Sequence, residues 1–145
     1  MALPETMSGV ALIGIGGPEM LEWRDDLPVP TPSENDVIVR VKAAGVNNTD
    51  INTRDGWYSK SDSSPDDAAW TGSPLTFPRI QGADVCGKIV AVGTAVDTAR
   101  IGERILIEPC LREVNGKTLE TPWYFGSECD GGFAQYTRIA NQYAH

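Results

Sequence analysis

Glycine and proline interrupt this sequence every few residues, and that spacing limits what the chain can fold into. The 145 residues include 15 glycines and 10 prolines, and both residue types favour turns over the interiors of helices and strands. The sequence has no internal repeat and no amphipathic helical pattern longer than a few turns. It therefore predicts one mainly β domain, a partly open barrel or sandwich with short helical turns and two long loops.

The clearest strand signal lies at residues 37–44. Apolar residues at every odd position alternate with charged residues, as in a half-buried strand. The predicted buried face holds Val37, Val39, Val41 and Ala43, and Arg40 and Lys42 lie on the other face. Further strands are predicted at the start of the segment 7–17 and at 20–23, 85–93, 105–107 and 133–139.

Three glycines after the first predicted strand resemble part of a dinucleotide-binding loop. Gly14, Gly16 and Gly17 are present, but Glu19 occupies the third glycine position of that pattern. No helix and no acidic ribose contact follow at the proper distance. A hairpin turn is the better interpretation.

The two long loops are predicted at 59–74 and 109–128. The first is polar and acidic, with too little apolar surface to order itself and Trp70 as its anchor. It fits a mobile lid over a substrate and a solvated loop without a role equally well. The second is interpreted as irregular.

Charge and composition exclude several partners. The formal net charge of −8 repels nucleic-acid phosphates and anionic membranes, so we expect neither partner. No apolar run approaches the roughly 20 residues of a membrane span, and the first residues do not resemble a signal peptide. The cytoplasm is the expected compartment. The three cysteines, Cys86, Cys110 and Cys129, are odd in number and widely spaced, which indicates reduced structural thiols.

The candidate site is the polar end of the clearest strand, at 44–50. Amide and hydroxyl groups orient a substrate by hydrogen bonding, and a tyrosine can donate a proton to a developing carbanion or enolate. The side chains available are Asn47, Asn48, Thr49, Asp50 and, further on, Tyr58. The same residues also fit a turn in which Thr49 or Asp50 caps a short helix at 50–54. The residues alone leave both interpretations open.

Other chemistry lacks the side chains it needs. The only histidine is His145, the last residue, which we expect to be frayed. The cysteines show no paired spacing, so no metal site is predicted. Without an internal histidine or a G-x-S-x-G turn, nucleophilic catalysis is not supported either.

The order of several segments resembles one known family. The matching pieces are Gly-Pro-Glu at 17–19, the strand 37–45, the loop 45–50 and the segments 82–93, 101–105 and 131–136. This set resembles the N-terminal GroES-like catalytic domain of the medium-chain dehydrogenase/reductase superfamily, which includes zinc-type alcohol dehydrogenases and quinone oxidoreductases. The resemblance spans nearly the whole chain.

The resemblance also shows where this chain departs from the zinc enzymes. They carry a cysteine at the position of Asn47 and a His-Glu pair at Ala83-Asp84, so the chain resembles the zinc-lacking quinone oxidoreductase and enoyl reductase branches. In those branches an asparagine at the Asn47 position lies near nicotinamide and substrate. Tyr58 resembles a proton-donating tyrosine, and Thr49 occupies the position of a hydroxyl relay. The resemblance implies NADP as cofactor and no zinc.

By the same resemblance, residues 1–145 form the substrate-side domain of a longer enzyme whose Rossmann domain is absent here. We expect the full-length protein to be a homodimer that reduces a small-molecule quinone or activated C=C, and this chain alone to be inactive. One alternative is a stand-alone binding module like the co-chaperonin that shares the barrel. Another is a divergent zinc-dependent alcohol dehydrogenase using Asp84 and Cys86.

Overall fold

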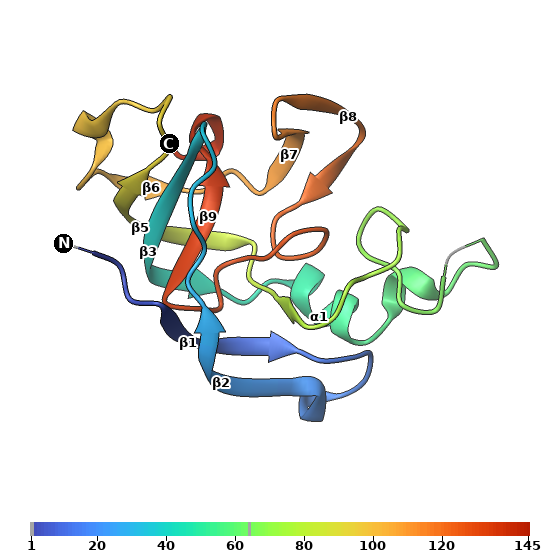
Figure 1. Ribbon diagram of the computed structural model, residues 1–145. Helices are drawn as coiled ribbons and strands as arrows, with labels where there is room; N and C mark the ends of the chain where they lie inside the picture. The colour runs from blue at the N-terminus through green and yellow to red at the C-terminus, as the bar shows by residue number, and fades with distance from the viewer. Residues whose placement is uncertain (1, 64) are drawn as a thin grey trace.

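The computed structural model describes residues 2–63 and 65–145 and is built from three antiparallel sheets that do not close (Figure 1). The first sheet, in the order β2-β1-β4, contains β1 (Thr6–Leu12), β2 (Leu21–Pro28) and β4 (Arg79–Ile80). The second, in the order β6-β5-β3-β9, contains β3 (Asp36–Gly45), β5 (Asp84–Val92), β6 (Arg104–Leu106) and β9 (Tyr136–Ala140). The third pairs β7 (Cys110–Val114) with β8 (Lys117–Tyr124).

Helical structure is short, as predicted. The helix α1 (Asn48–Arg54) follows β3 directly. Single 3₁₀ turns occupy Pro18–Met20, Trp57–Ser59, Thr98–Arg100 and Asn141–Tyr143. The prediction of a mainly β, partly open barrel with short helical turns is confirmed.

The main core lies between the four-stranded sheet and the β7–β8 hairpin. Its side chains include Val37, Val39, Ile89, Ile105, Leu111, Phe125 and Ile139. A smaller cluster of Met7, Leu27 and Ile80 lies under the N-terminal sheet. Burial of each large apolar side chain contributes about 1.5–3 kcal/mol, so Phe125, only 1% exposed, fixes the end of β8 firmly against the sheet.

The predicted face of β3 is correct only for its first half. Val37 and Val39 are buried, whereas Ala43 is exposed and Ala44 packs against the core. The register against β5 shifts between Val41 and Ala43. A bulge of this kind adds one residue to a strand and moves the following side chains to the opposite face.

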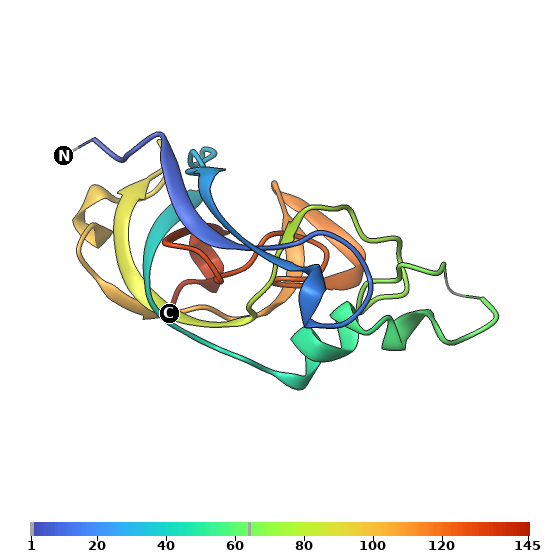
Figure 2. The same cartoon turned by 90° about the horizontal axis from the view of Figure 1, so that it is seen from below.

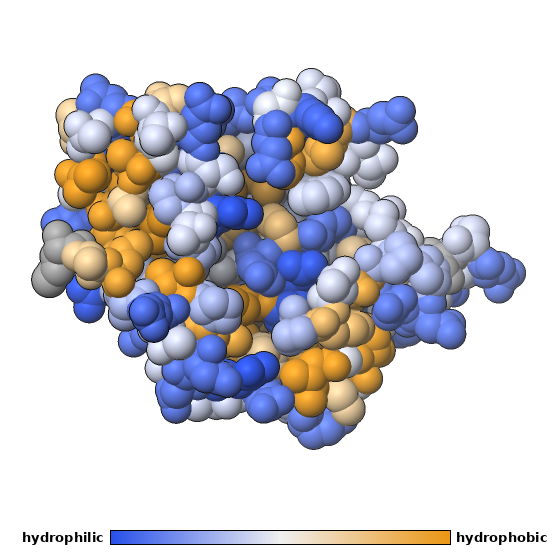
Figure 3. Space-filling view, viewed as in Figure 1, coloured by the Kyte–Doolittle hydropathy of each residue, from blue (hydrophilic) through white to orange (hydrophobic). Residues whose placement is uncertain are grey.

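The glycine-rich segment after β1 is a hairpin turn, as interpreted. Leu12 pairs with Leu21 across it, and β2 then runs to Pro28, well past the predicted strand at 20–23. The turn contacts the end of α1, because Gly16 N donates to Arg54 O and the Arg54 Nη1 donates back to Gly16 O. Figure 3 shows an apolar group on the surface in this area, where Ile13, Leu21 and Ile51 are exposed.

The prediction that 109–128 is irregular is wrong. Residues 110–124 form the β7–β8 hairpin, and Val114 pairs with Lys117 around Asn115-Gly116. Both turn residues have positive φ, 52° and 73°, which is the geometry that Asn-Gly favours in a two-residue hairpin. That dipeptide was readable in the sequence.

The last predicted strand, 133–139, begins later than expected. β9 covers only Tyr136–Ala140. The residues before it cross to the N-terminal sheet instead, where Val10 N donates to Phe133 O and Gln135 N donates to Ser8 O. This crossing joins the two larger sheets.

The loop 59–74 projects from the body of the molecule in both views (Figures 1 and 2). Ser64 lies outside the described residues. The prediction that this stretch cannot order itself is wrong for its second half, because Ala68 and Ala69 are buried and Ala68 bridges to Pro74. Trp70 itself is 39% exposed.

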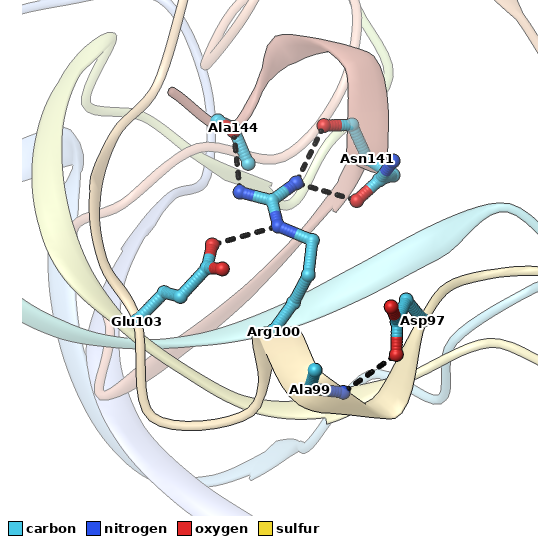
Figure 4. Close-up of polar contacts among 6 residues, drawn as sticks. All are labelled: Asp97, Ala99, Arg100, Glu103, Asn141 and Ala144. Carbon is cyan, nitrogen blue, oxygen red and sulfur yellow. Dashed lines mark hydrogen bonds and ion pairs between the residues drawn. The ribbon is translucent and has the colours of Figure 1, made fainter.

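The C-terminal end is fixed, so the expectation that His145 is frayed is wrong. His145 N donates to Leu106 O, and Leu106 N donates to His145 O. Figure 4 shows a second attachment, in which the Arg100 guanidinium donates to Glu103, to both oxygens of Asn141 and to Ala144 O.

Across residues 2–63 and 65–145, the structure contains no helix with the length and hydrophobicity needed to cross a membrane.

Candidate functional site

The site predicted at 44–50 lies where β3 ends and α1 begins. Asn47 is the N-cap of α1, since its Oδ1 accepts from Thr49 N at 3.3 Å. Asp50 completes a capping box by accepting from Asn47 N at 2.8 Å. A capping box satisfies two backbone donors that a helix start leaves free. The helix-capping interpretation is therefore correct, with Asn47 rather than Thr49 as the cap.

Asp50 also joins α1 to the segment before β5. Its Oδ1 accepts from Gly82 N at 3.1 Å, and its backbone oxygen accepts from the Gln81 side chain at 2.9 Å. The side chain is buried. Burial raises the pKa of the Asp50 carboxyl, the amides of Asn47 and Gly82 lower it, and the charge of Asp84 raises it.

Asn47 extends the site to β5. Its Nδ2 donates to Asp84 Oδ2 at 2.8 Å, across the pairing of Gly45 with Asp84. An asparagine amide carries two N–H donors and two acceptor lone pairs. One of each is used here, so Asn47 retains one donor and one acceptor for a bound molecule.

Thr49 behaves differently. Its hydroxyl oxygen is buried, and no hydrogen-bond partner for it lies within the described part of the chain. A ligand cannot reach a buried oxygen without rotation of the side chain. In this conformation the hydroxyl acts neither as a cap nor as a ligand contact.

Tyr58 follows α1 on the 3₁₀ turn Trp57–Ser59. Gly56 precedes it with φ 69°, and this left-handed residue directs the chain away from the helix axis. The Tyr58 ring meets that of Trp57 edge-on, with centroids 5.2 Å apart.

Tyr124 is a site residue that the sequence interpretation missed. A series of backbone contacts brings it to the same edge as Asp84: Ile107 N donates to Val85 O, and Phe125 N donates to Pro109 O. The turn after Tyr124 is packed so closely that a Cβ added at Gly126 would lie 2.8 Å from Gly82 N. Burial raises the pKa of the Tyr124 hydroxyl, and Asp84, Asp50, Tyr58 and Cys110 raise it further.

These donors do not fit a catalytic zinc ion. Zinc takes thiolate, imidazole or carboxylate ligands, and of Asn47, Ala83 and Asp84 only the last supplies one. Burial raises the pKa of the Cys129 thiol to about 12, which keeps it neutral. Within residues 2–63 and 65–145, no three histidine, cysteine, aspartate or glutamate side chains gather closely enough to hold a metal.

A family comparison agrees with this topology. Residues 33–145 match the model of the alcohol dehydrogenase GroES-like domain. The chain belongs to this family. The resemblance to the medium-chain dehydrogenase/reductase superfamily is thereby confirmed, and the similar proteins are oxidoreductases.

Individual relatives support the same family. Quinone oxidoreductase from Lama guanicoe is 30% identical over 135 residues, which cover 93% of this chain and 32% of that protein. The NADPH-dependent alkenal/one oxidoreductase of Arabidopsis thaliana is 30% identical over 138 residues, or 95% of this chain and 30% of that protein.

A solved structure from Sinorhizobium meliloti 1021, described as an alcohol dehydrogenase, is 42% identical with a TM-score of 0.86. The match covers 99% of this chain and 40% of that one. The chain spans about a third of the length of the curated relatives it matches.

Proposed function

We propose that this chain is the substrate-side domain of a zinc-independent, NADP-dependent oxidoreductase that reduces a quinone or an activated C=C by hydride transfer. The observation that carries the proposal is the Asn47–Asp84 hydrogen bond. By the family resemblance, the zinc enzymes carry a cysteine at the position of Asn47 and a His-Glu pair at Ala83-Asp84, and here an amide and a carboxylate bond to each other instead.

Asn47 is suited to hold a nicotinamide and a carbonyl substrate. Its amide is fixed at both ends, by Thr49 N and by Asp84, so its remaining donor and acceptor have fixed directions. Preorganised donors of this kind stabilise charge that develops during a reaction. Val46, beside it, is 73% exposed and offers apolar surface to a flat ring.

NADPH, when bound, supplies the hydride. Hydride addition to one carbon of an activated double bond leaves an enolate, which needs a proton at the other carbon. Tyr58 is the proposed acid, and the neutral Tyr124 hydroxyl lies at the same edge of the sheet. A tyrosine hydroxyl is a group that can donate a proton to such an enolate.

Two of the relatives support this substrate class by their names, a quinone oxidoreductase and an alkenal/one oxidoreductase. The latter is named as NADPH-dependent. Alcohol oxidation is the second candidate, because the Sinorhizobium meliloti protein is described as an alcohol dehydrogenase.

A chimaera tests the proposal. This chain would replace the matching segment of the Sinorhizobium meliloti protein, whose remaining 60% (100% minus the 40% covered) lies outside the match. We expect NADPH oxidation with a quinone or an enone, unchanged after dialysis against a chelator. Asn47→Ala should lower kcat/KM at least tenfold, because the amide no longer orients the reacting groups.

Chelator-sensitive oxidation of alcohols by NAD⁺, without quinone or enone reduction, would establish the second candidate instead. The chain by itself should show no enzyme-level turnover with NADPH. Asn48→Ala is the matched control, because Asn48 is exposed and makes no contact used in the site.

A further inference from the structure

Trp70 has no role in the proposal above, and its ring packs against the ring of Tyr124. Trp70 lies on the projecting loop and Tyr124 at the end of β8, so the two come from distant parts of the sequence. Their ring centroids are 5.3 Å apart with 31° between the planes, a tilted stack. Trp70 remains 39% exposed, so the stack leaves aromatic surface open.

A network around Glu128 holds the pair in place. One carboxylate oxygen accepts from Tyr124 N at 2.6 Å, and the other accepts from both Thr71 N and Thr71 Oγ1 at 3.0 Å. Trp70 N donates to Ser127 Oγ at 3.1 Å. Hydrogen bonds to a charged acceptor are stronger than neutral ones, so the loop is fixed beside the end of β8.

The fixed pair borders the site. Tyr124 precedes Phe125, whose N–H donates to Pro109 O. Two residues before Pro109, the N–H of Ile107 donates to Val85 O. Val85 is the neighbour of Asp84, the partner of the Asn47 amide. The aromatic surface is therefore carried by segments that adjoin the reacting groups.

We propose that Trp70 and Tyr124 form an aromatic wall that binds flat conjugated acceptors by stacking, so that quinones and aryl enones are preferred over small aliphatic enals. The inference rests on the proposed function and narrows its substrate class. Offset and tilted stacking suits such ligands because aromatic rings attract edge to face and with offset. The role is one of substrate positioning, without a proton or electron transfer by either ring.

Ligand binding to the chain tests the wall without any turnover. The probe is 2-(hydroxymethyl)anthraquinone, which is flat, uncharged and unreactive toward thiols. Nitrogen-15 spectra of the chain would follow the indole N–H signals of its four tryptophans during titration. We expect the Trp70 signal to move most, because a ring stacked beside it shifts the resonance.

Matched variants separate stacking from other effects. Trp70→Leu and Tyr124→Leu should each weaken anthraquinone binding about tenfold, the scale of a lost aromatic contact. Tyr124→Phe keeps the ring and should bind within twofold of the native chain. Trp23→Leu, on β2 with a 66% exposed side chain, should have no effect. Binding of 2-cyclohexenone should change less than twofold in all four.

Absence of anthraquinone binding, or equal binding by the native chain and Trp70→Leu, would overturn the wall. Failure of the proposed function is distinguishable from this result. A chimaera that reduces quinones with an unchanged KM after Trp70→Leu keeps the function and loses the wall. If the chain binds anthraquinone through Trp70 but the chimaera does not oxidise NADPH, the aromatic wall is supported and the proposed function is contradicted.

Discussion

Two polar networks in this molecule use similar groups in opposite ways. Around Arg100, one guanidinium makes four hydrogen bonds, to Glu103, to Asn141 twice and to Ala144. Around Asn47, the amide keeps a donor and an acceptor unused, and the neighbouring Thr49 hydroxyl has no partner in the described part of the chain.

The difference in how many hydrogen-bonding groups are used distinguishes a network that stabilises the fold from one that can bind a ligand. A guanidinium has five N–H donors in a fixed fork, and at Arg100 three of the four hydrogen bonds attach Asn141 and Ala144 near the C-terminal end of the chain. The free donor and acceptor of Asn47 lie at a solvent-accessible position, where a ligand can replace water as their partner. We therefore propose that the Arg100 network stabilises the fold and that the Asn47 network binds substrate, with Asp50 holding the second network in place.

The largest expected effect on stability comes from substitution of Asp50, whose carboxylate accepts from the N–H groups of Asn47 and Gly82. Asp50→Ala leaves the N–H groups of Asn47 and Gly82 without their acceptor. Such buried donors and the lost cap together should lower the free energy of unfolding by about 3 kcal/mol. Urea unfolding followed by fluorescence measures the loss. Asp50→Asn is the control, because its amide oxygen keeps one acceptor. A loss below about 1 kcal/mol in Asp50→Ala would show that Asp50 does not hold the site together.

Removal of the saturated network at Arg100 should have the next largest effect. Arg100→Met keeps the length of the side chain but leaves Ala144 O without its donor and removes the hydrogen bonds to Glu103 and to the Asn141 side chain, so we expect about 2 kcal/mol of destabilisation. Arg104→Met, at an exposed position on β6, should change little. In the chimaera, Arg100→Met should leave KM unchanged at a temperature where the protein is folded. A specific loss of substrate binding would contradict the structural assignment.

The pH dependence of stability sharpens the role of Asp50 further. Burial raises the pKa of this carboxyl in the folded state, so the folded protein binds the proton more tightly than the unfolded chain does. The tighter proton binding by Asp50 stabilises the folded state fully at pH values below the pKa of the unfolded chain, about 3.9. This stabilisation is lost as the pH rises through the raised pKa of the folded state. The native chain should thus lose stability relative to Asp50→Asn across that window, which urea titrations at pH steps from 3.5 to 7 would measure. The opposite slope would mean that the Asn47 and Gly82 amides outweigh burial.

The smallest expected effect on stability is at Thr49. Thr49→Val keeps the β-branched shape and removes a hydroxyl that has no partner among residues 2–63 and 65–145, so stability should stay equal or rise by up to about 0.5 kcal/mol. Thermal unfolding measures this change. The chimaera shows whether the hydroxyl is also a relay, since a relay would make Thr49→Val lose activity at unchanged stability. Equal activity would remove Thr49 from the catalytic candidates.

Local patterns decided most of the fold in advance. The glycines after β1 predicted the hairpin, the alternation at 37–44 predicted β3, and the polar residues after it predicted both a helix cap and a site. The Asn115-Gly116 turn was equally readable and was overlooked. Hairpins, caps and strand faces depend on neighbouring residues, so a sequence window contains the necessary information.

Tertiary structure alone decided which distant residues meet. No window around Asn47 contains Asp84 as its hydrogen-bond partner, and none predicts that the rings of Tyr124 and Trp70 stack on each other. The bulge in β3 likewise moved Ala44, rather than Ala43, into the core because of the register with β5. By itself the sequence determined the kinds of groups available at the site, among them the amide of Asn47 and the carboxylates of Asp50 and Asp84. Chain packing determined which of those groups are saturated and which remain free to bind.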